Sequence, residues 1–61
     1  MNLFEWINRG REDQYYILLI VKDLEDGTLF PVYFYTDKEA DEYKNNIISE
    51  SKMKVMQSYY L

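Results

Sequence analysis

The sequence feature that most constrains the fold is the apolar run Tyr15–Val21, seven residues without a charge in a chain of 61. Alternate side chains of a strand point to opposite faces, so a strand built on this run is apolar on both faces. Such a strand is typical of the centre of a sheet. We therefore predict a central strand over residues 14–23. One face carries Tyr15, Ile17, Leu19 and Val21, and the other carries Tyr16, Leu18 and Ile20.

A tight turn and an edge strand follow this run. Glu25, Asp26 and Gly27 are typical of a hairpin, because glycine adopts the positive φ that such turns require. We predict a second strand over residues 28–35. Pro31 lies inside it and has no backbone N–H to donate, so this strand belongs at an edge of the sheet.

The clearest prediction is a helix over residues 37–50. Thr36 and Glu39 have the spacing of a capping box, in which each side chain satisfies a free donor at the helix start. Acidic residues crowd the first turns, where the helix dipole favours negative charge. Ala40 and Ile47 lie on one stripe of this helix and predict the side that packs on the sheet.

The ends of the chain complete the set of elements. Asn2 and Glu5 also have capping-box spacing and predict a short helix over residues 2–9. We predict that residues 9–13 form a polar connector. Alternation of apolar and polar residues predicts a last strand over residues 52–60.

These elements predict one small α+β domain over residues 1–61, in the order α-β-β-α-β. The long helix returns the last strand parallel to the second, so the simplest sheet is antiparallel with spatial order 2-1-3. The long helix packed on one face makes a two-layer sandwich. The core predicted between this helix and the sheet comprises Ile17, Leu19, Val21, Phe30, Val32, Phe34, Tyr43, Ile47 and Val55.

Composition excludes several classes of protein. Without cysteine or histidine the chain has no disulfide framework, thiolate zinc site or His-based catalytic triad. The acidic turn over residues 23–27 lacks the later bidentate Glu of a calcium loop. We expect no catalysis, no metal and no cofactor. With no leader segment and no apolar run of the roughly 20 residues that span a bilayer, we expect a cytoplasmic protein.

The sheet face turned away from the long helix is the most informative surface. An antiparallel sheet usually turns a polar face to water, but this face is predicted to be apolar and rich in tyrosine, which marks an interaction surface. Two alternatives stay open: the helix over residues 2–9 covers this face, or the face pairs with a second copy. The predicted partner-binding residues are Tyr16, Leu18, Tyr33, Tyr35, Met56 and Tyr60.

Carboxylates on the connectors and the outer helix surface are predicted to steer a partner with a basic surface. The steering residues are Asp23, Glu25, Asp26, Asp41 and Glu42. In size, acidity and order of elements, the chain resembles small phage-encoded inhibitors such as anti-CRISPR proteins and glycosylase inhibitors. This resemblance implies an inhibitor whose carboxylates stand in for nucleic-acid phosphates. Residues whose codons are rich in A and T outnumber those whose codons are rich in G and C, which is typical of AT-rich bacteria and their phages and plasmids.

Three hypotheses for the function follow. The leading one is a non-catalytic binding module, encoded by a phage or mobile element, that inhibits a host protein and occludes its nucleic-acid-binding surface. The second is a homodimerising accessory protein. The third is binding of single-stranded nucleic acid on the tyrosine face, which the formal charge of −4 disfavours.

Overall fold

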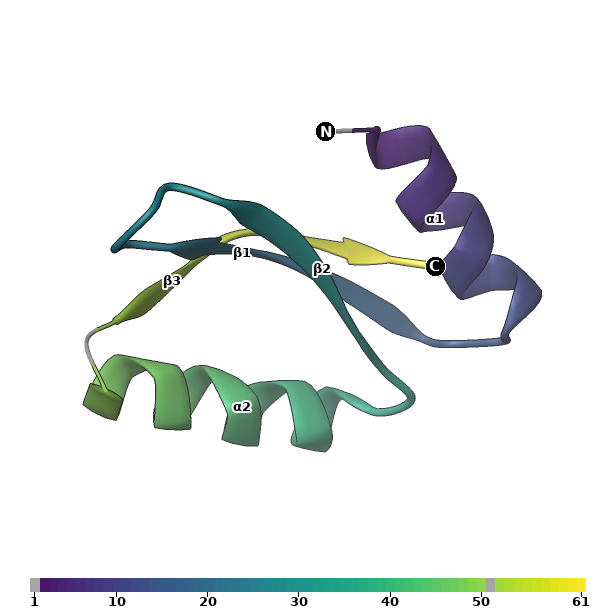
Figure 1. Cartoon of the computed structure of the whole chain (residues 1–61). Helices are drawn as coiled ribbons and strands as arrows, with labels where there is room; N and C mark the ends of the chain where they lie inside the picture. Colours follow the sequence, from purple (N-terminus) through teal and green to yellow (C-terminus); the bar gives the residue numbers. More distant parts are fainter. Residues whose placement is uncertain (1, 51) are drawn as a thin grey trace.

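The computed structural model describes residues 2–50 and 52–61, with side chains throughout these ranges except at 48–50. It contains α1 (Leu3–Glu12), β1 (Ile17–Asp23), β2 (Leu29–Phe34), α2 (Asp37–Glu50) and β3 (Met53–Tyr60). The strands form an antiparallel sheet in the order β2-β1-β3, and α2 runs along one face (Figure 1). The predicted fold class, element order and strand order are therefore confirmed.

The core between α2 and the sheet matches the prediction. Residues of β1 and α2 form a fully buried cluster, and side chains of β2, β3 and α2 pack around it. All nine predicted core residues belong to this cluster or its shell, together with Ala40 and Met53. Each fully buried aliphatic side chain contributes about 1.5–3 kcal/mol, so this cluster stabilises the attachment of α2 to the sheet.

The hydrogen bonds of the hairpin confirm that Pro31 lies at an edge. The Asp23 N–H donates to the Thr28 carbonyl at 2.8 Å. In an antiparallel pair, bonding and non-bonding positions alternate, so even-numbered residues of β2 bond to β1. Pro31 is odd-numbered, and its missing N–H falls on the side facing away from β1. Gly27 closes the turn with φ of 77°, as predicted.

Helix α1 is longer than predicted. Asn2 caps it, accepting the Glu5 N–H at 3.2 Å, but the helix continues to Glu12 instead of ending at residue 9. The predicted polar connector over residues 9–13 is therefore wrong. Gly10, which weakens a helix interior, is buried there against the side chains of Tyr33 and Leu61. Because glycine has no side chain, α1 can pack closely on Tyr33 and Leu61 at this position.

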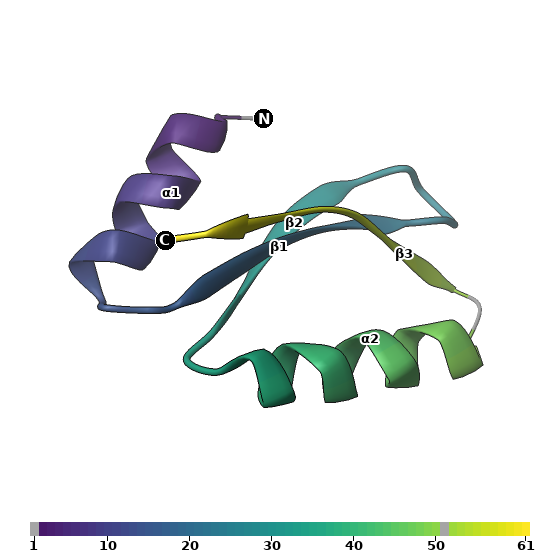
Figure 2. The same cartoon turned by 180° about the vertical axis from the view of Figure 1, so that it is seen from behind.

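One end of the sheet face opposite α2 is covered by α1. Figure 1 and, from behind, Figure 2 show α1 standing over the end of the sheet where the C-terminus lies, on the side away from α2. The Tyr33 hydroxyl donates to the Trp6 carbonyl at 2.6 Å, and Leu18 is 0% exposed. At this end of the sheet, the interpretation of the face as an open docking surface is therefore wrong, and the first helix folds over it as in the alternative.

A β-bulge in β3 exchanges the faces of its last residues. Ile20 pairs with Gln57, but the next residue, Val21, pairs with Val55, which leaves Met56 as an extra residue. Because side chains alternate with a period of two, one extra residue moves those beyond it to the opposite face. Tyr60 pairs with Ile17 and so lies on the α2 side, whereas Tyr59 and Leu61 share the face of Leu18. Tyr60 was predicted on the face turned away from the long helix, and that placement is wrong for this reason.

A second irregularity lies where β1 begins. The strand starts at Ile17 instead of residue 14, after a turn in which Gln14 has φ of 62°. The Tyr16 N–H donates to the Phe34 carbonyl at 2.9 Å although Ile17 is the residue paired with Phe34. Tyr16 and Ile17 of β1 therefore both face Phe34 of β2, as in a β-bulge. Tyr15 accordingly lies with Tyr33 rather than with Ile17, which reverses its predicted face.

Candidate functional site

The six predicted partner-binding residues do not form one surface. Leu18 is fully buried and Tyr33 is half-buried beneath α1, whereas Tyr16, Tyr35, Met56 and Tyr60 are exposed. The exposed residues divide into two groups at the end of the sheet where β1 begins and β2 and β3 end, with Met56 apart at its bulge. The predicted set is therefore wrong as a single patch, although four of its members are accessible.

The first group is a tyrosine stack, made of Tyr15, Tyr33 and Tyr35. The Tyr15 ring lies 4.4 Å from that of Tyr35 and 5.1 Å from that of Tyr33, with interplanar angles of 21° and 28°. A hydrogen bond with Tyr15 and partial burial raise the pKa of Tyr35, and the nearby Asp13 and Glu39 carboxylates raise it further. Tyr35 is nevertheless 56% exposed, so it presents a supported ring to solvent.

The second group is a tyrosine pair, made of Tyr16 and Tyr60. Their ring centroids lie 5.4 Å apart in an edge-to-face arrangement. The Asp37 carboxylate chiefly raises the pKa of Tyr60, with smaller contributions from partial burial, Tyr16 and Asp41. Tyr60 is 67% exposed. The pair therefore lies on the β3 side of α2, beside its first two turns.

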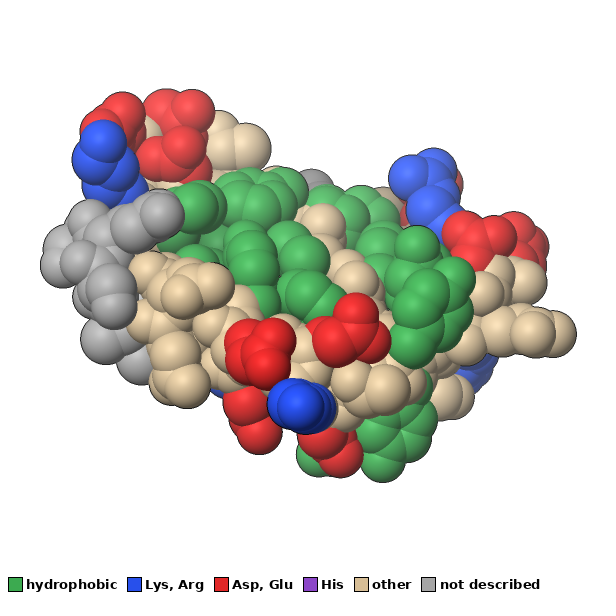
Figure 3. Space-filling model, turned by 90° about the horizontal axis from the view of Figure 1, so that it is seen from below, with side chains coloured by type: hydrophobic (Ala, Val, Ile, Leu, Met, Phe, Trp, Pro, Cys, Tyr) green, Lys and Arg blue, Asp and Glu red, His purple; other side chains and the backbone are tan. Residues whose placement is uncertain are grey.

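The N-terminal half of α2 carries exposed carboxylates, of which Glu39 lies near Tyr35 and Asp37 and Asp41 lie near Tyr60. The predicted capping box is present: the Thr36 hydroxyl donates to the Glu39 carboxylate at 3.1 Å and accepts the Glu39 N–H at 3.2 Å. Figure 3, which looks onto α2, shows acidic side chains along the helix with hydrophobic side chains on both sides of it. We define the acidic helix surface as Asp37, Glu39, Asp41, Glu42 and the adjoining Tyr35.

The predicted steering residues fall in two separate places. Asp41 and Glu42 lie on the acidic helix surface. Asp23 ends β1, and Glu25 and Asp26 lie in the turn that follows, at the other end of the sheet (Figure 1). The Asp23 and Asp26 carboxylates accept backbone N–H groups of the turn at 2.8 Å. Hydrogen bonds from Thr28 lower the pKa of Asp26. These two carboxylates therefore shape the turn.

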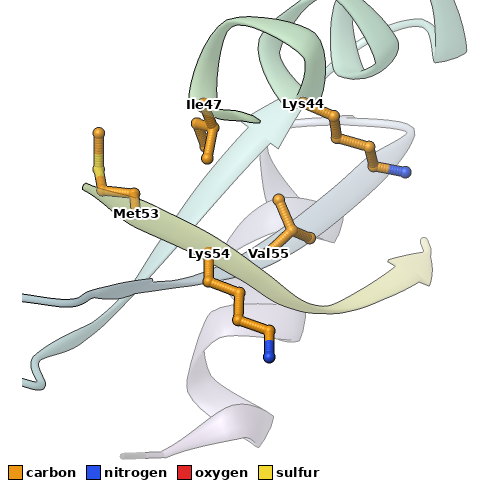
Figure 4. A pocket seen from close by; sticks show the side chains of 5 residues that line it. All are labelled: Lys44, Ile47, Met53, Lys54 and Val55. Atoms are coloured by element: carbon orange, nitrogen blue, oxygen red, sulfur yellow. The ribbon is translucent and has the colours of Figure 1, made fainter. Parts of the chain in front are cut away.

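A pocket of about 240 Å³ lies between α2 and β3, lined by Lys44, Ile47, Met53, Lys54 and Val55. Figure 4 shows the Ile47 and Val55 side chains pointing toward one another and Lys54 pointing away from α2. The pocket is therefore an apolar hollow with a lysine, Lys44, on its helix side. Nothing in the sequence predicted it, because it depends on how α2 lies across β3.

Two negative findings apply to residues 2–50 and 52–61. No three carboxylate side chains there are grouped so that they could hold a metal ion. No helix in this part of the chain has the length and apolar character needed to cross a membrane.

No protein-family model matches the chain, and neither the curated proteins nor the solved structures include one with significant similarity to it. The class of the protein is therefore defined by its geometry. It is a small α+β domain in which two helices cover a three-stranded sheet, with exposed tyrosines beside an acidic helix.

Proposed function

We propose that this chain is a non-catalytic protein-binding module that recognises a basic surface of its partner through the acidic helix surface. The observation that carries the proposal is the position of Tyr35, a largely exposed aromatic ring supported by Tyr15 and placed beside carboxylates. In the finer form of the proposal, the chain is a phage or mobile-element inhibitor of a host protein.

The tyrosine stack suits Tyr35 to the role of an anchor. Tyrosine is enriched among residues that dominate binding energy, because a large rigid ring buries much area for few frozen rotamers. The contacts of Tyr35 with Tyr15 restrict the ring before a partner arrives, and such preorganisation lowers the entropic cost of binding. An arginine guanidinium of the partner could stack on the open side of this ring.

The charge of the acidic helix surface favours the same kind of partner. Four carboxylates project from the first turns of α2 (Figure 3), and Lys38 is the one cation among residues 37–42. Complementary potentials accelerate encounter and exclude acidic partners more than they add affinity. A basic surface that normally binds nucleic-acid phosphates fits this requirement, and its occupation would inhibit the partner.

A capture experiment with matched variants tests the proposal. The tagged chain is incubated with lysate of its source cells, and retained proteins are identified by mass spectrometry. We expect one basic protein to be retained, to be lost with Tyr35→Ser, and to be weakened with Asp41→Asn/Glu42→Gln. Phe4→Ser, which removes an exposed ring on α1, is the control and should retain the protein.

Two outcomes oppose the proposal. Retention of the same protein by wild type and by both acidic-surface variants would show that binding uses another surface. Retention of nothing beyond a tag-only control would remove the partner altogether. Circular dichroism of each variant confirms that loss of capture does not reflect loss of folding.

A further inference from the structure

The outer edge of β3 is an open template for strand pairing. The Leu61 N–H donates to the Tyr16 carbonyl at 2.9 Å, and bonding positions alternate. Ser58 and Tyr60 therefore direct their backbone N–H and C=O groups away from β1. The opposite edge of the sheet contains Pro31, whereas β3 contains no proline. An edge strand without proline can pair with another chain, and in β3 the stretch open to such pairing is the one that follows the bulge.

The α2 side of β3 carries a projection at one end and a hollow at the other. Tyr60 projects near the C-terminal end and is 67% exposed. The pocket lined by Ile47, Met53 and Val55 lies at the N-terminal end (Figure 4). The bulge at Met56 places both on one face, because without it Tyr60 would lie on the face of Leu18.

On the β3 side of α2, acidic side chains lie toward the N-terminal end of the helix and a basic side chain lies farther along it. Asp37 and Asp41 lie beside Tyr60, and Lys44 lies beside the pocket. An antiparallel arrangement of two such edges brings the acidic end of one copy to the basic end of the other. The pattern is therefore self-complementary, as a two-fold interface requires.

We propose that two copies of this chain pair antiparallel through β3 to form a continuous six-stranded sheet. Tyr60 of each copy enters the apolar hollow of the other, and Lys44 of each copy faces Asp37 and Asp41 of the other. Pairing is centred on Ser58, so that Tyr60 of each copy lies across from Met56 and next to Val55 of the other. Before Met56 the bulge bends the strand and interrupts regular hydrogen bonding.

The dimer goes beyond the proposed function and does not depend on it. In such a sheet both α2 helices lie on one face, so the two acidic helix surfaces point to the same side. A partner with two basic sites would then be held by both copies, with a gain in avidity. Tyr35 lies on the β2 side of α2 and is free of the dimer interface, which allows the two proposals to be tested separately.

Sedimentation equilibrium of the purified chain over a range of micromolar concentrations tests the dimer. We expect a reversible dimer, weakened about tenfold or more by Tyr60→Ser, which removes a central aromatic anchor. Lys44→Glu should weaken it as well, and the exchange Lys44→Glu/Asp41→Lys should restore it. Tyr35→Ser is the matched control, since it removes another largely exposed tyrosine outside β3, and should leave dimerisation unchanged.

A crosslinking measurement covers the case in which Tyr60→Ser does not fold. The chain has no cysteine, so a single introduced cysteine can form a disulfide only between copies. Ser58→Cys should give a dimer on mild oxidation, whereas Leu24→Cys in the exposed turn should not. A monomer at all concentrations, equal crosslinking at both positions, or a dimer indifferent to Tyr60→Ser and Lys44→Glu would overturn the proposal.

Discussion

Replacement of Gly10 by alanine tests how α1 is packed on the sheet. A Cβ at this position would lie 2.5 Å from Leu61 Cδ1 and 2.7 Å from Tyr33 Cε1, closer than carbon atoms approach in folded proteins. The end of the Leu61 side chain can rotate away. Tyr33 cannot move as easily, because its hydroxyl is bonded to Trp6 and its ring stacks on Tyr15.

Two opposing effects set the size of the change. Alanine is more favourable than glycine in a helix interior by about 0.8–1.0 kcal/mol. Added volume in a well-packed site costs about 1–3 kcal/mol. Because the Tyr33 ring would lose its contacts if it moved, we expect the steric cost to dominate and the free energy of unfolding to fall by about 1 kcal/mol. For a domain of this size the midpoint of thermal unfolding should fall by about 4–8 °C.

Urea unfolding followed by far-UV circular dichroism and by Trp6 fluorescence measures this change. The control repeats Gly10→Ala in a Tyr33→Leu background, where the obstructing ring is absent. There the alanine should stabilise the chain by about 0.5–1 kcal/mol, so the sign of the effect reverses. If Gly10→Ala stabilises the otherwise unchanged chain, α1 does not pack on Tyr33 as described, and the sheet face that it covers is open.

Three further predictions concern the turns and pH. Thr36→Ala should lower the free energy of unfolding by about 1 kcal/mol through loss of the helix cap, whereas Thr36→Ser should not, as urea unfolding would measure. Gly27→Ala should cost about 1–2 kcal/mol by the same assay, because φ of 77° is strained for alanine although no atom lies near its Cβ. Burial raises the pKa of Tyr33 above 10.0, so the unfolded chain loses this proton first. The contribution of Tyr33 to the free energy of unfolding should therefore be complete below pH 10 and be lost as the pH rises beyond it. Urea midpoints measured over this range should fall less steeply in Tyr33→Phe.

The fold was predictable because its main determinants are local or periodic. The apolar run around Leu19 identified a central strand, Pro31 assigned its neighbour to an edge, and Thr36 and Glu39 located the start of the long helix. The alternation on β1 and β2 then predicted the core beneath α2. Each of these inferences depends on residues close together in the sequence, and the structure confirms them.

The surface was less predictable because it depends on irregularities in strand pairing. A single extra residue at Met56 exchanged the faces of Tyr59 and Tyr60, and a similar irregularity exchanged those of Tyr15 and Tyr16. Residue types do not locate either irregularity, because the run Tyr15–Val21 is apolar on both faces and the broken alternation around Met56 does not show which residue is the extra one. The roles of Asp37 and Glu39 beside the tyrosines were missed for the same reason.

The edges of the sheet are more accessible than its central strand. The residues of β1 from Ile17 to Val21 are almost fully buried, with α2 on one face of the sheet and α1 over one end of the other. A partner therefore cannot reach the centre of the sheet from either side. Of the two edges, β2 has lost a hydrogen-bond donor at Pro31, whereas β3 has not. The edge of β3 and the outer surface of α2 remain accessible, and these are the regions that carry Tyr60 and the carboxylates on which the two proposals rest.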